Sequence, residues 1–120
     1  METKVFVDNV FSAVDRMDMD TFLSYLDSEV MFRFGNGPAV NGIEPQVKEA
    51  VSGFFGSIRA LSHTIEQMWE QGDHLICKGT ATYTRKDEKK VSVPFATIFG
   101  LKDGKIASYE IYVDLAPLFA

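Results

Sequence analysis

Apolar positions with a helical period occupy the first part of the chain. Residues 3 to 17 carry a stripe of apolar side chains spaced three and four apart, which predicts a helix. The stripe comprises Phe6, Val7, Val10, Phe11, Val14 and Met17. Asp18 or Asp20 can then cap a second, shorter helix. That helix would hold Phe22, Leu23 and Leu26.

The middle of the chain predicts one strand and a third helix. Residues 30 to 34 read as a strand, and residues 35 to 38 (Gly-Asn-Gly-Pro) as a turn. The third helix starts at Gly42-Ile43-Glu44-Pro45, because proline is tolerated in a first helical turn. Its apolar side is formed by Val47, Val51, Phe54, Phe55 and Ile58.

From residue 62 onward the pattern is that of strands. The predicted strands cover about 62–70, 74–84, 91–101 and 105–113. Asp103-Gly104 between two apolar runs is a strong hairpin signal. Helices followed by an antiparallel meander predict a single α+β domain over residues 1–120, with the helices on one face of the sheet.

Composition and charge exclude several function classes. The chain has 120 residues and a net charge of −5, which argues against a nucleic-acid partner. No apolar run reaches membrane-spanning length, so we expect a cytoplasmic protein without a membrane partner. The single cysteine, Cys77, lies in an apolar run and is expected to be a small core residue. Ten phenylalanines could supply either a thick core or an aromatic cavity.

The order of elements, the turn at residues 102–106 (Lys-Asp-Gly-Lys-Ile) and the ending at residues 109–118 (Tyr-Glu-Ile-Tyr-Val-Asp-Leu-Ala-Pro-Leu) resemble the nuclear transport factor 2-like superfamily, SnoaL-like branch. That superfamily includes ketosteroid isomerases, polyketide cyclases, limonene epoxide hydrolase and scytalone dehydratases. The resemblance implies a cone-shaped barrel, in which a strongly curved mixed or antiparallel sheet wraps around the N-terminal helices. It also implies a homodimer through the outer face of the sheet. One fold hosts several chemistries here, so function must be argued from the site.

Strand alternation assigns side chains to the inner or outer face of the sheet. The inner set would be His63, Ile65, Gln67 and Trp69 on one strand, and Leu75, Cys77, Gly79, Ala81 and Tyr83 on the next. On the last strand, the resemblance places Asp114 on the inner face of the sheet. The side chains that alternate with it along the strand are more apolar, so the apolar pattern favours the opposite assignment. A partner subunit that covers Tyr109, Ile111 and Val113 on the outer face would resolve this conflict. A bulge in the strand would instead exchange the inner and outer sets of side chains.

Three residues are candidates for catalysis. The resemblance to epoxide hydrolases and polyketide cyclases makes Asp114 an acid or base at the end of the last strand, although a carboxylate there can equally cap residues 115–117. His63 could form a proton-transfer pair with Asp114, or be a hydrogen-bonded wall residue. Tyr83 or Tyr112 could donate a hydrogen bond to a developing oxyanion.

A second set of residues could line the pocket and bind a ligand, although aromatic residues of this kind also serve as plain core. The set is Phe32, Arg33, Phe34, Phe54, Trp69 and Tyr112. Arg33 lies opposite Phe32 and Phe34 in the alternation, so it could face solvent or pair with a carboxylate or an anionic ligand group.

The sequence departs from the better-understood relatives in informative ways. Residues 32–36 contain no acid, whereas ketosteroid isomerases carry their general base in this region. Gly79 and Ala81 stand where the epoxide hydrolases carry an Arg-x-Asp unit. The two histidines show no zinc-ligand spacing, so no metal is expected.

These features leave three functions open. The first is a cofactor-free isomerase, cyclase or dehydratase that performs acid–base chemistry on a small hydrophobic carbonyl compound. The second is a module that binds a small hydrophobic ligand without chemistry. The third is a dimerisation domain, whose interface would contain Thr64, Met68, Thr80, Thr82, Ile98 and Ile111.

Overall fold

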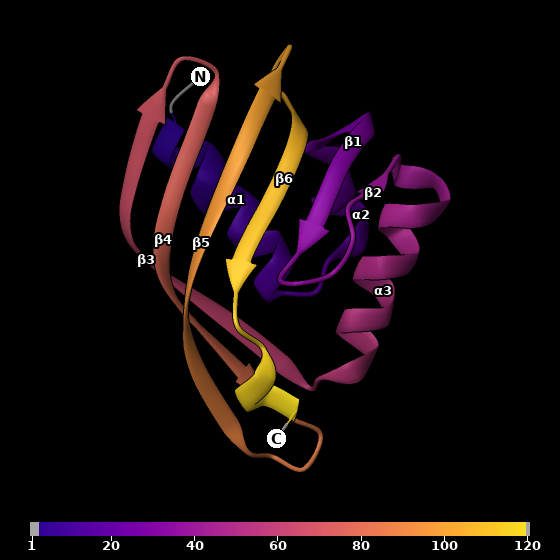
Figure 1. The fold of residues 1–120 in the computed structure, drawn as a ribbon, viewed down its shortest axis with the longest axis vertical. Coiled ribbons are helices and arrows are strands. Elements are labelled where there is room, and N and C mark those ends of the chain that lie inside the picture. The colour runs from indigo at the N-terminus through magenta and orange to yellow at the C-terminus, as the bar shows by residue number, and fades with distance from the viewer. Residues whose placement is uncertain (1–2, 120) are drawn as a thin grey trace.

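The computed structural model describes residues 3–119, which form three α-helices and one curved sheet of six strands (Figure 1). In chain order the elements are α1 (Thr3–Asp15), α2 (Met19–Ser24), β1 (Leu26–Phe34), β2 (Val40–Asn41), η1 (Ile43–Val47), α3 (Lys48–Ser57), β3 (Ala60–Gln71), β4 (His74–Thr84), β5 (Lys90–Lys102), β6 (Lys105–Val113) and η2 (Ala116–Phe119). The α+β prediction is confirmed.

The helices follow the predicted apolar stripes. α1 buries Phe6, Val7, Val10, Phe11 and Ala13. α2 begins after Asp18, whose carboxylate accepts a hydrogen bond from the Thr21 amide at 3.3 Å. Leu26, predicted in the second helix, instead opens β1, which is four residues longer at its start than the predicted strand. The predicted start of the third helix coincides with η1, a short π-helical segment that is kinked at Glu44 and runs directly into α3.

The sheet is mixed, with the strand order β2-β1-β6-β5-β4-β3. The predicted four-stranded antiparallel meander is confirmed, and β1 joins it by pairing parallel to β6. The short β2 at the edge was not predicted. In Figure 1, α1 runs behind the curved sheet and α3 stands beside β1, so the sheet wraps partly around the helices without closing into a barrel.

Two irregularities in strand pairing reverse the alternation of side chains. The register of β3 against β4 shifts between Ile65 and Gln67, so Met68 packs against the core and the Trp69 side chain is 46% exposed. The predicted inner position of Trp69 is therefore wrong, as is that of the exposed Gln67. The pairing of β5 with β6 shifts between Gly100 and Leu101, before Tyr109.

The shift at β6 settles the conflict over the last strand. Ile106 and Tyr109 are both buried, although strict alternation would place them on opposite faces. Ile111 continues the inner face begun by Tyr109. The prediction that Tyr109 and Ile111 belong to an outer interface is therefore wrong, and Met68 likewise leaves that predicted interface.

β4 follows the predicted alternation throughout. Leu75, Cys77, Ala81 and Tyr83 are buried. Burial raises the pKa of the Cys77 thiol to about 12, so it remains a protonated core residue. Gly79 is buried where the backbone of β3 passes directly over it, and a side-chain carbon there would collide with the carbonyl group of Thr64. Only glycine fits this approach, which lies next to the irregularity in β3.

None of the helices within residues 3–119 combines the length and the apolar character required to cross a bilayer.

Candidate functional site

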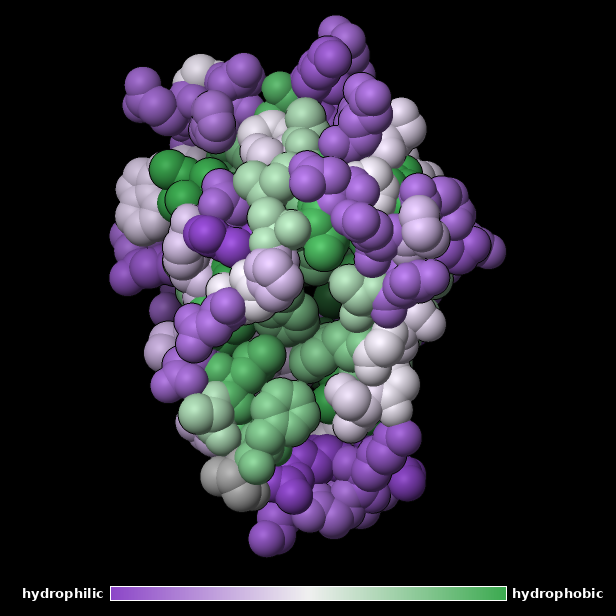
Figure 2. All heavy atoms as spheres, turned by 45° about the vertical axis from the view of Figure 1, so that its right-hand side comes forward, coloured by the Kyte–Doolittle hydropathy of each residue, from purple (hydrophilic) through white to green (hydrophobic). Residues whose placement is uncertain are grey.

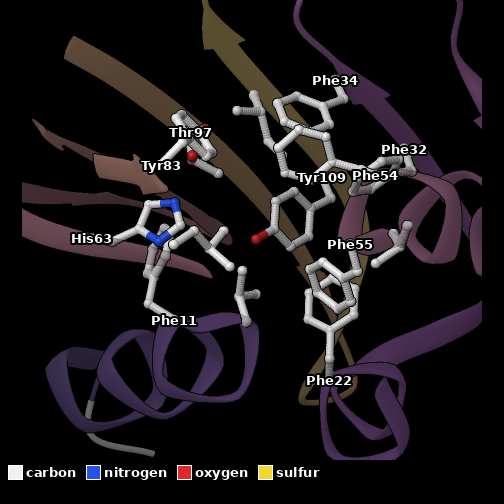
Figure 3. A pocket seen from close by; sticks show the side chains of 14 residues that line it. Phe11, Phe22, Phe32, Phe34, Phe54, Phe55, His63, Tyr83, Thr97 and Tyr109 are labelled. Carbon is white, nitrogen blue, oxygen red and sulfur yellow. The ribbon is translucent and has the colours of Figure 1, made fainter. Parts of the chain in front are cut away.

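A small aromatic chamber lies between the helices and the concave face of the sheet (Figure 3). Its free volume is about 50 Å³, and six of its lining residues are phenylalanines. The lining consists of Phe11, Val14, Phe22, Phe32, Phe34, Val51, Phe54, Phe55, Leu61, His63, Tyr83, Thr97, Tyr109 and Ile111. Figure 2 shows the face on the α3 side, which is hollowed near its centre where hydrophobic side chains gather. We call this cavity the chamber.

His63 lines the chamber and pairs with Asp15, whose side chain lies outside the chamber in the neighbouring groove between α1 and β3. The His63 ring nitrogen Nδ1 lies 2.6 Å from Asp15 Oδ1, and the His63 backbone amide donates to Asp15 Oδ2 at 3.0 Å. The last residue of α1 therefore binds both the ring and the backbone of β3. The His63 side chain is 9% exposed, and its ring contacts Phe11 and Phe95 at centroid distances of 4.8 and 5.1 Å. These contacts hold the imidazole in one orientation.

The pairing also determines which ring nitrogen is available for chemistry. An ionised carboxylate only accepts hydrogen bonds, so in the neutral imidazole the proton resides on Nδ1 and Nε2 carries the lone pair. In Figure 3 one ring nitrogen of His63 lies on the α1 side and the other points toward Tyr83 and Thr97. Nε2 is therefore a proton acceptor that faces the chamber.

Two tyrosines bring hydroxyl groups to the same space. Burial, followed by the charge of Asp15, raises the pKa of Tyr83 to about 12. Burial also raises the pKa of the Tyr109 phenol well above its ordinary value. Both hydroxyls therefore stay protonated at neutral pH and can donate hydrogen bonds. In Figure 3 the Tyr109 hydroxyl points into the chamber, toward the side where His63 lies. Thr97, which is 1% exposed, adds a third hydroxyl-bearing side chain to the lining.

The structure brings together five of the predicted site residues. Phe32, Phe34, Phe54, His63 and Tyr83 all line the chamber. They come from β1, α3, β3 and β4, so their proximity follows from the wrapping of the sheet around the helices.

Asp114 lies outside the chamber. Its carboxylate is exposed, accepts a hydrogen bond from the Ala116 amide at 3.0 Å, and borders a shallow groove with Asn36 and Tyr112. The prediction that Asp114 forms the polar end of the pocket is wrong, because the inner face of β6 is the set that contains Tyr109 and Ile111. The alternative interpretation, a cap for the segment after the strand, matches its hydrogen bond.

Arg33, Trp69 and Tyr112 are also absent from the chamber lining. Arg33 donates to Glu110 at 3.1 Å and to the Tyr112 hydroxyl at 2.9 Å, and its guanidinium lies 5.4 Å from the centre of the Tyr112 ring. The predicted ligand-lining positions of these three residues are wrong. Arg33 alternates with Phe32 and Phe34, and Tyr112 alternates with Ile111, so both point away from the core.

Sequence reasoning missed Asp15 and Tyr109. A signal for Asp15 was present, because it follows the buried Phe11 by one helical turn and therefore lies on the same side of α1. Tyr109 was assigned to the wrong face of its strand. Within residues 3–119 no group of three or more histidine, cysteine, aspartate or glutamate side chains is placed to hold a metal ion.

Comparisons with known proteins identify the family and the fold. A model of the SnoaL-like domain matches residues 7–109. No curated protein matches the chain. Among solved structures, an NTF2-like protein of unknown function from Burkholderia pseudomallei K96243 superposes with a TM-score of 0.87 at 17% identity, covering 99% of this chain and 96% of the other.

Two further structures carry the same fold. An LEH-like epoxide hydrolase from M. tuberculosis superposes with a TM-score of 0.78 at 17% identity, covering 94% of this chain and 83% of the other. A protein with a ketosteroid isomerase-like fold from Catenulispora acidiphila DSM 44928, in complex with trimethylamine, superposes with a TM-score of 0.82 at 19% identity, covering 92% and 85%. At these identities the comparisons establish the fold, and its chemistry must come from the site.

Proposed function

Because the chain belongs to the SnoaL-like domain family, whose model matches residues 7–109, we propose that it binds a small neutral carbonyl compound in the chamber and moves a proton on it without a cofactor. The observation that carries this proposal is the position of His63, which lines a mainly apolar chamber and pairs at 2.6 Å with Asp15 outside it. Among residues 3–119 no lysine or arginine lines the chamber, so these residues offer an anionic ligand no lysine or arginine counter-charge there.

The proposed step is removal of a proton from the carbon beside the carbonyl group. His63 Nε2 accepts this proton, the electron pair of the broken C–H bond forms the C=C bond of an enolate, and the carbonyl oxygen takes the negative charge. His63 then carries a proton on each nitrogen, and the adjacent Asp15 carboxylate stabilises that cation. Return of the proton to the same or another carbon completes an exchange or an isomerisation.

Tyr83 and Tyr109 would act on the oxygen. Their raised pKa values keep both hydroxyls protonated, so either can donate a hydrogen bond to the enolate oxygen. The negative charge of Asp15 contributes to raising both pKa values. Acting alone, it would also destabilise a negatively charged enolate nearby. Protonation of His63 cancels this effect, because the histidine–aspartate pair is then neutral as a whole.

Solvent exchange provides a test that needs no knowledge of the natural substrate. Cyclohexanone is incubated with the protein in deuterated water, and the loss of the signal of the protons beside its carbonyl group is followed by NMR. We expect the wild-type protein to accelerate this loss. We expect His63→Gln to abolish the acceleration, and Asp15→Asn to reduce it by about a hundredfold or more, since the asparagine amide can bind the wrong tautomer of histidine.

His74→Gln is the matched control, because His74 is the other histidine, is 54% exposed, and pairs with Asp73 at the β3–β4 turn. This variant should exchange protons at the wild-type rate. Equal rates in the wild-type protein and His63→Gln would contradict the proposal. Ketone binding without acceleration in the wild-type protein would instead leave a binding module.

We also propose that the outer face of the sheet pairs with a second copy of the chain. Register places Trp69, Ile76 and Ile98 in one cross-strand row, which continues to the ion pair of Arg33 with Glu110. Outward-facing apolar side chains at these positions favour burial against a partner. Sedimentation should show a dimer at micromolar concentration, and Ile98→Lys should shift it to monomer. A monomeric wild-type protein would contradict this proposal.

A further inference from the structure

The chamber is small for the ligand that the proposed function requires. Its free volume of about 50 Å³ has room for one or two water molecules. Sites for organic ligands in proteins measure about 300 Å³ or more. A carbonyl compound with even one ring must therefore displace part of the lining.

An apolar hollow lies next to the chamber. It has a volume of about 280 Å³ and is lined by Phe32, Phe34, Gly37, Pro38, Val40 and Ala50. We call it the outer hollow. Phe32 and Phe34 line both spaces, so these two rings form the wall between them.

The two rings differ in how firmly they are held. Phe32 is 4% exposed and packs against Tyr109 at a centroid distance of 5.3 Å. Phe34 is only partly buried and is the last residue of β1, immediately before the turn at Gly35. Its aromatic contact is an edge-to-face pair with Phe54 at 4.7 Å. Phe34 is therefore the part of the wall that can move.

The partner ring on α3, Phe54, makes edge-to-face contacts with Phe34 and with Tyr83. Val51 is the only buried residue of α3, and Phe54 is half-buried. The helix contains Gly53 and Gly56, and a side-chain carbon at either would meet open space. An edge-to-face aromatic pair is worth only about 0.5–1.5 kcal/mol beyond its buried area, so a ligand can replace it.

From this arrangement we propose that Phe34 determines the length of the ligand, and that the site takes an elongated neutral ketone. The carbonyl end would occupy the chamber beside His63 and Tyr83. A second apolar ring would displace the Phe34 side chain and lie in the outer hollow against Pro38 and Val40. This inference rests on the proposed function for the position of the carbonyl group, and assigns to Phe34 the selection of ligand size.

Two ketones that differ by one ring test this assignment. Cyclohexanone has only the carbonyl ring, whereas 4-phenylcyclohexanone carries a phenyl ring at the opposite end. The dissociation constant of each is measured by calorimetry for three proteins: the wild type, Phe34→Ala and Phe55→Ala. Phe55 is the matched control, because it lines the chamber but not the outer hollow, and its replacement removes the same atoms.

For each variant, the ratio of the dissociation constants of the two ketones gives the gain in affinity from the phenyl ring. We expect this gain to be at least about tenfold larger for Phe34→Ala than for Phe55→Ala, a difference of about 1.4 kcal/mol in binding free energy. Phe34→Leu should give an intermediate value, and it serves in place of Phe34→Ala if thermal unfolding shows that the alanine variant is not folded. In the wild-type protein, 4-phenylcyclohexanone should shift the NMR methyl signals of Val40 more than cyclohexanone does, because only its phenyl ring would lie against Val40.

An equal benefit of the phenyl ring in the Phe34 and Phe55 variants would overturn the inference. So would unshifted Val40 signals, or the absence of binding of both ketones to the folded Phe34 variants. The comparison of affinities involves no proton transfer. Exchange that does not depend on His63 would therefore remove the acid–base function and leave the role of Phe34 standing.

Discussion

The raised pKa of Tyr83 makes the stability of this protein depend on alkaline pH in a way that one substitution can isolate. In the folded chain this pKa rises from the ordinary value of 10.0 to about 12, chiefly because the phenol is buried. Above pH 10 the unfolded chain loses the phenolic proton and the folded chain keeps it. The unfolded state then binds fewer protons, so the free energy of unfolding falls as the pH rises. Below pH 10 both states hold the proton and Tyr83 contributes no pH dependence.

The magnitude follows from the two pKa values. Each unit of difference corresponds to about 1.4 kcal/mol between the two protonation states. At pH 12 the tyrosine of the unfolded chain is almost fully ionised and that of the folded chain is half ionised, which reduces the free energy of unfolding by about 2 kcal/mol. Tyr109, whose pKa is raised in the same direction, steepens the total decline in the wild-type protein.

Urea denaturation of the wild type and of Tyr83→Phe at intervals between pH 8 and pH 12 measures this effect (roughly two units either side of the ordinary tyrosine pKa). Phenylalanine keeps the packing against Phe54 and removes the titrating group. The difference in unfolding free energy between the two proteins should be constant up to pH 10 and should shrink by about 2 kcal/mol by pH 12. Parallel curves over the whole range would refute the reasoning, because they would show that Tyr83 ionises alike in both states.

Three further substitutions test other parts of the structure. Gly79→Ala should lower the free energy of unfolding by about 1–3 kcal/mol or more in urea denaturation, because the added methyl group meets the Thr64 carbonyl; a neutral result would contradict the close approach of the strands. Arg33→Ala should cost less than about 1 kcal/mol in the same assay, since the Arg33 side chain is 37% exposed; a larger loss would indicate a role beyond its pairing. Asp114→Asn should leave the exchange of cyclohexanone protons at the wild-type rate, whereas a loss comparable to that of His63→Gln would return Asp114 to the site.

Much of the fold could be predicted from the sequence because its signals are local. The stripe from Phe6 to Val14 has the period of α1, and the alternation from Leu75 to Tyr83 has the period of β4. The pair Asp103-Gly104 marks the hairpin between β5 and β6. The short β2 escaped prediction, since two residues contain no period and their pairing depends on the neighbouring β1.

The site was predicted only where strand alternation is unbroken. Tyr83 lies on a regular strand, and its inward direction could be counted along the sequence. Trp69 and Tyr109 lie beyond irregularities in pairing, each of which reverses the count and leaves no clear mark in the sequence. Asp15 could be placed on the buried side of α1, but its contact with His63 depends on how α1 crosses β3.

The chamber draws its lining from all three α-helices and from five of the six strands, and this makes ligand binding inseparable from folding. Detachment of any one layer would remove part of the binding surface, so a ligand should have little affinity for partly unfolded forms. Mass action then converts occupancy into stability, by about 2.7 kcal/mol at a free ligand concentration one hundred times the dissociation constant. In a domain of this size such a gain raises the melting temperature by about 10 °C. The melting temperature of the whole chain can therefore be used to search collections of neutral ketones for the natural ligand.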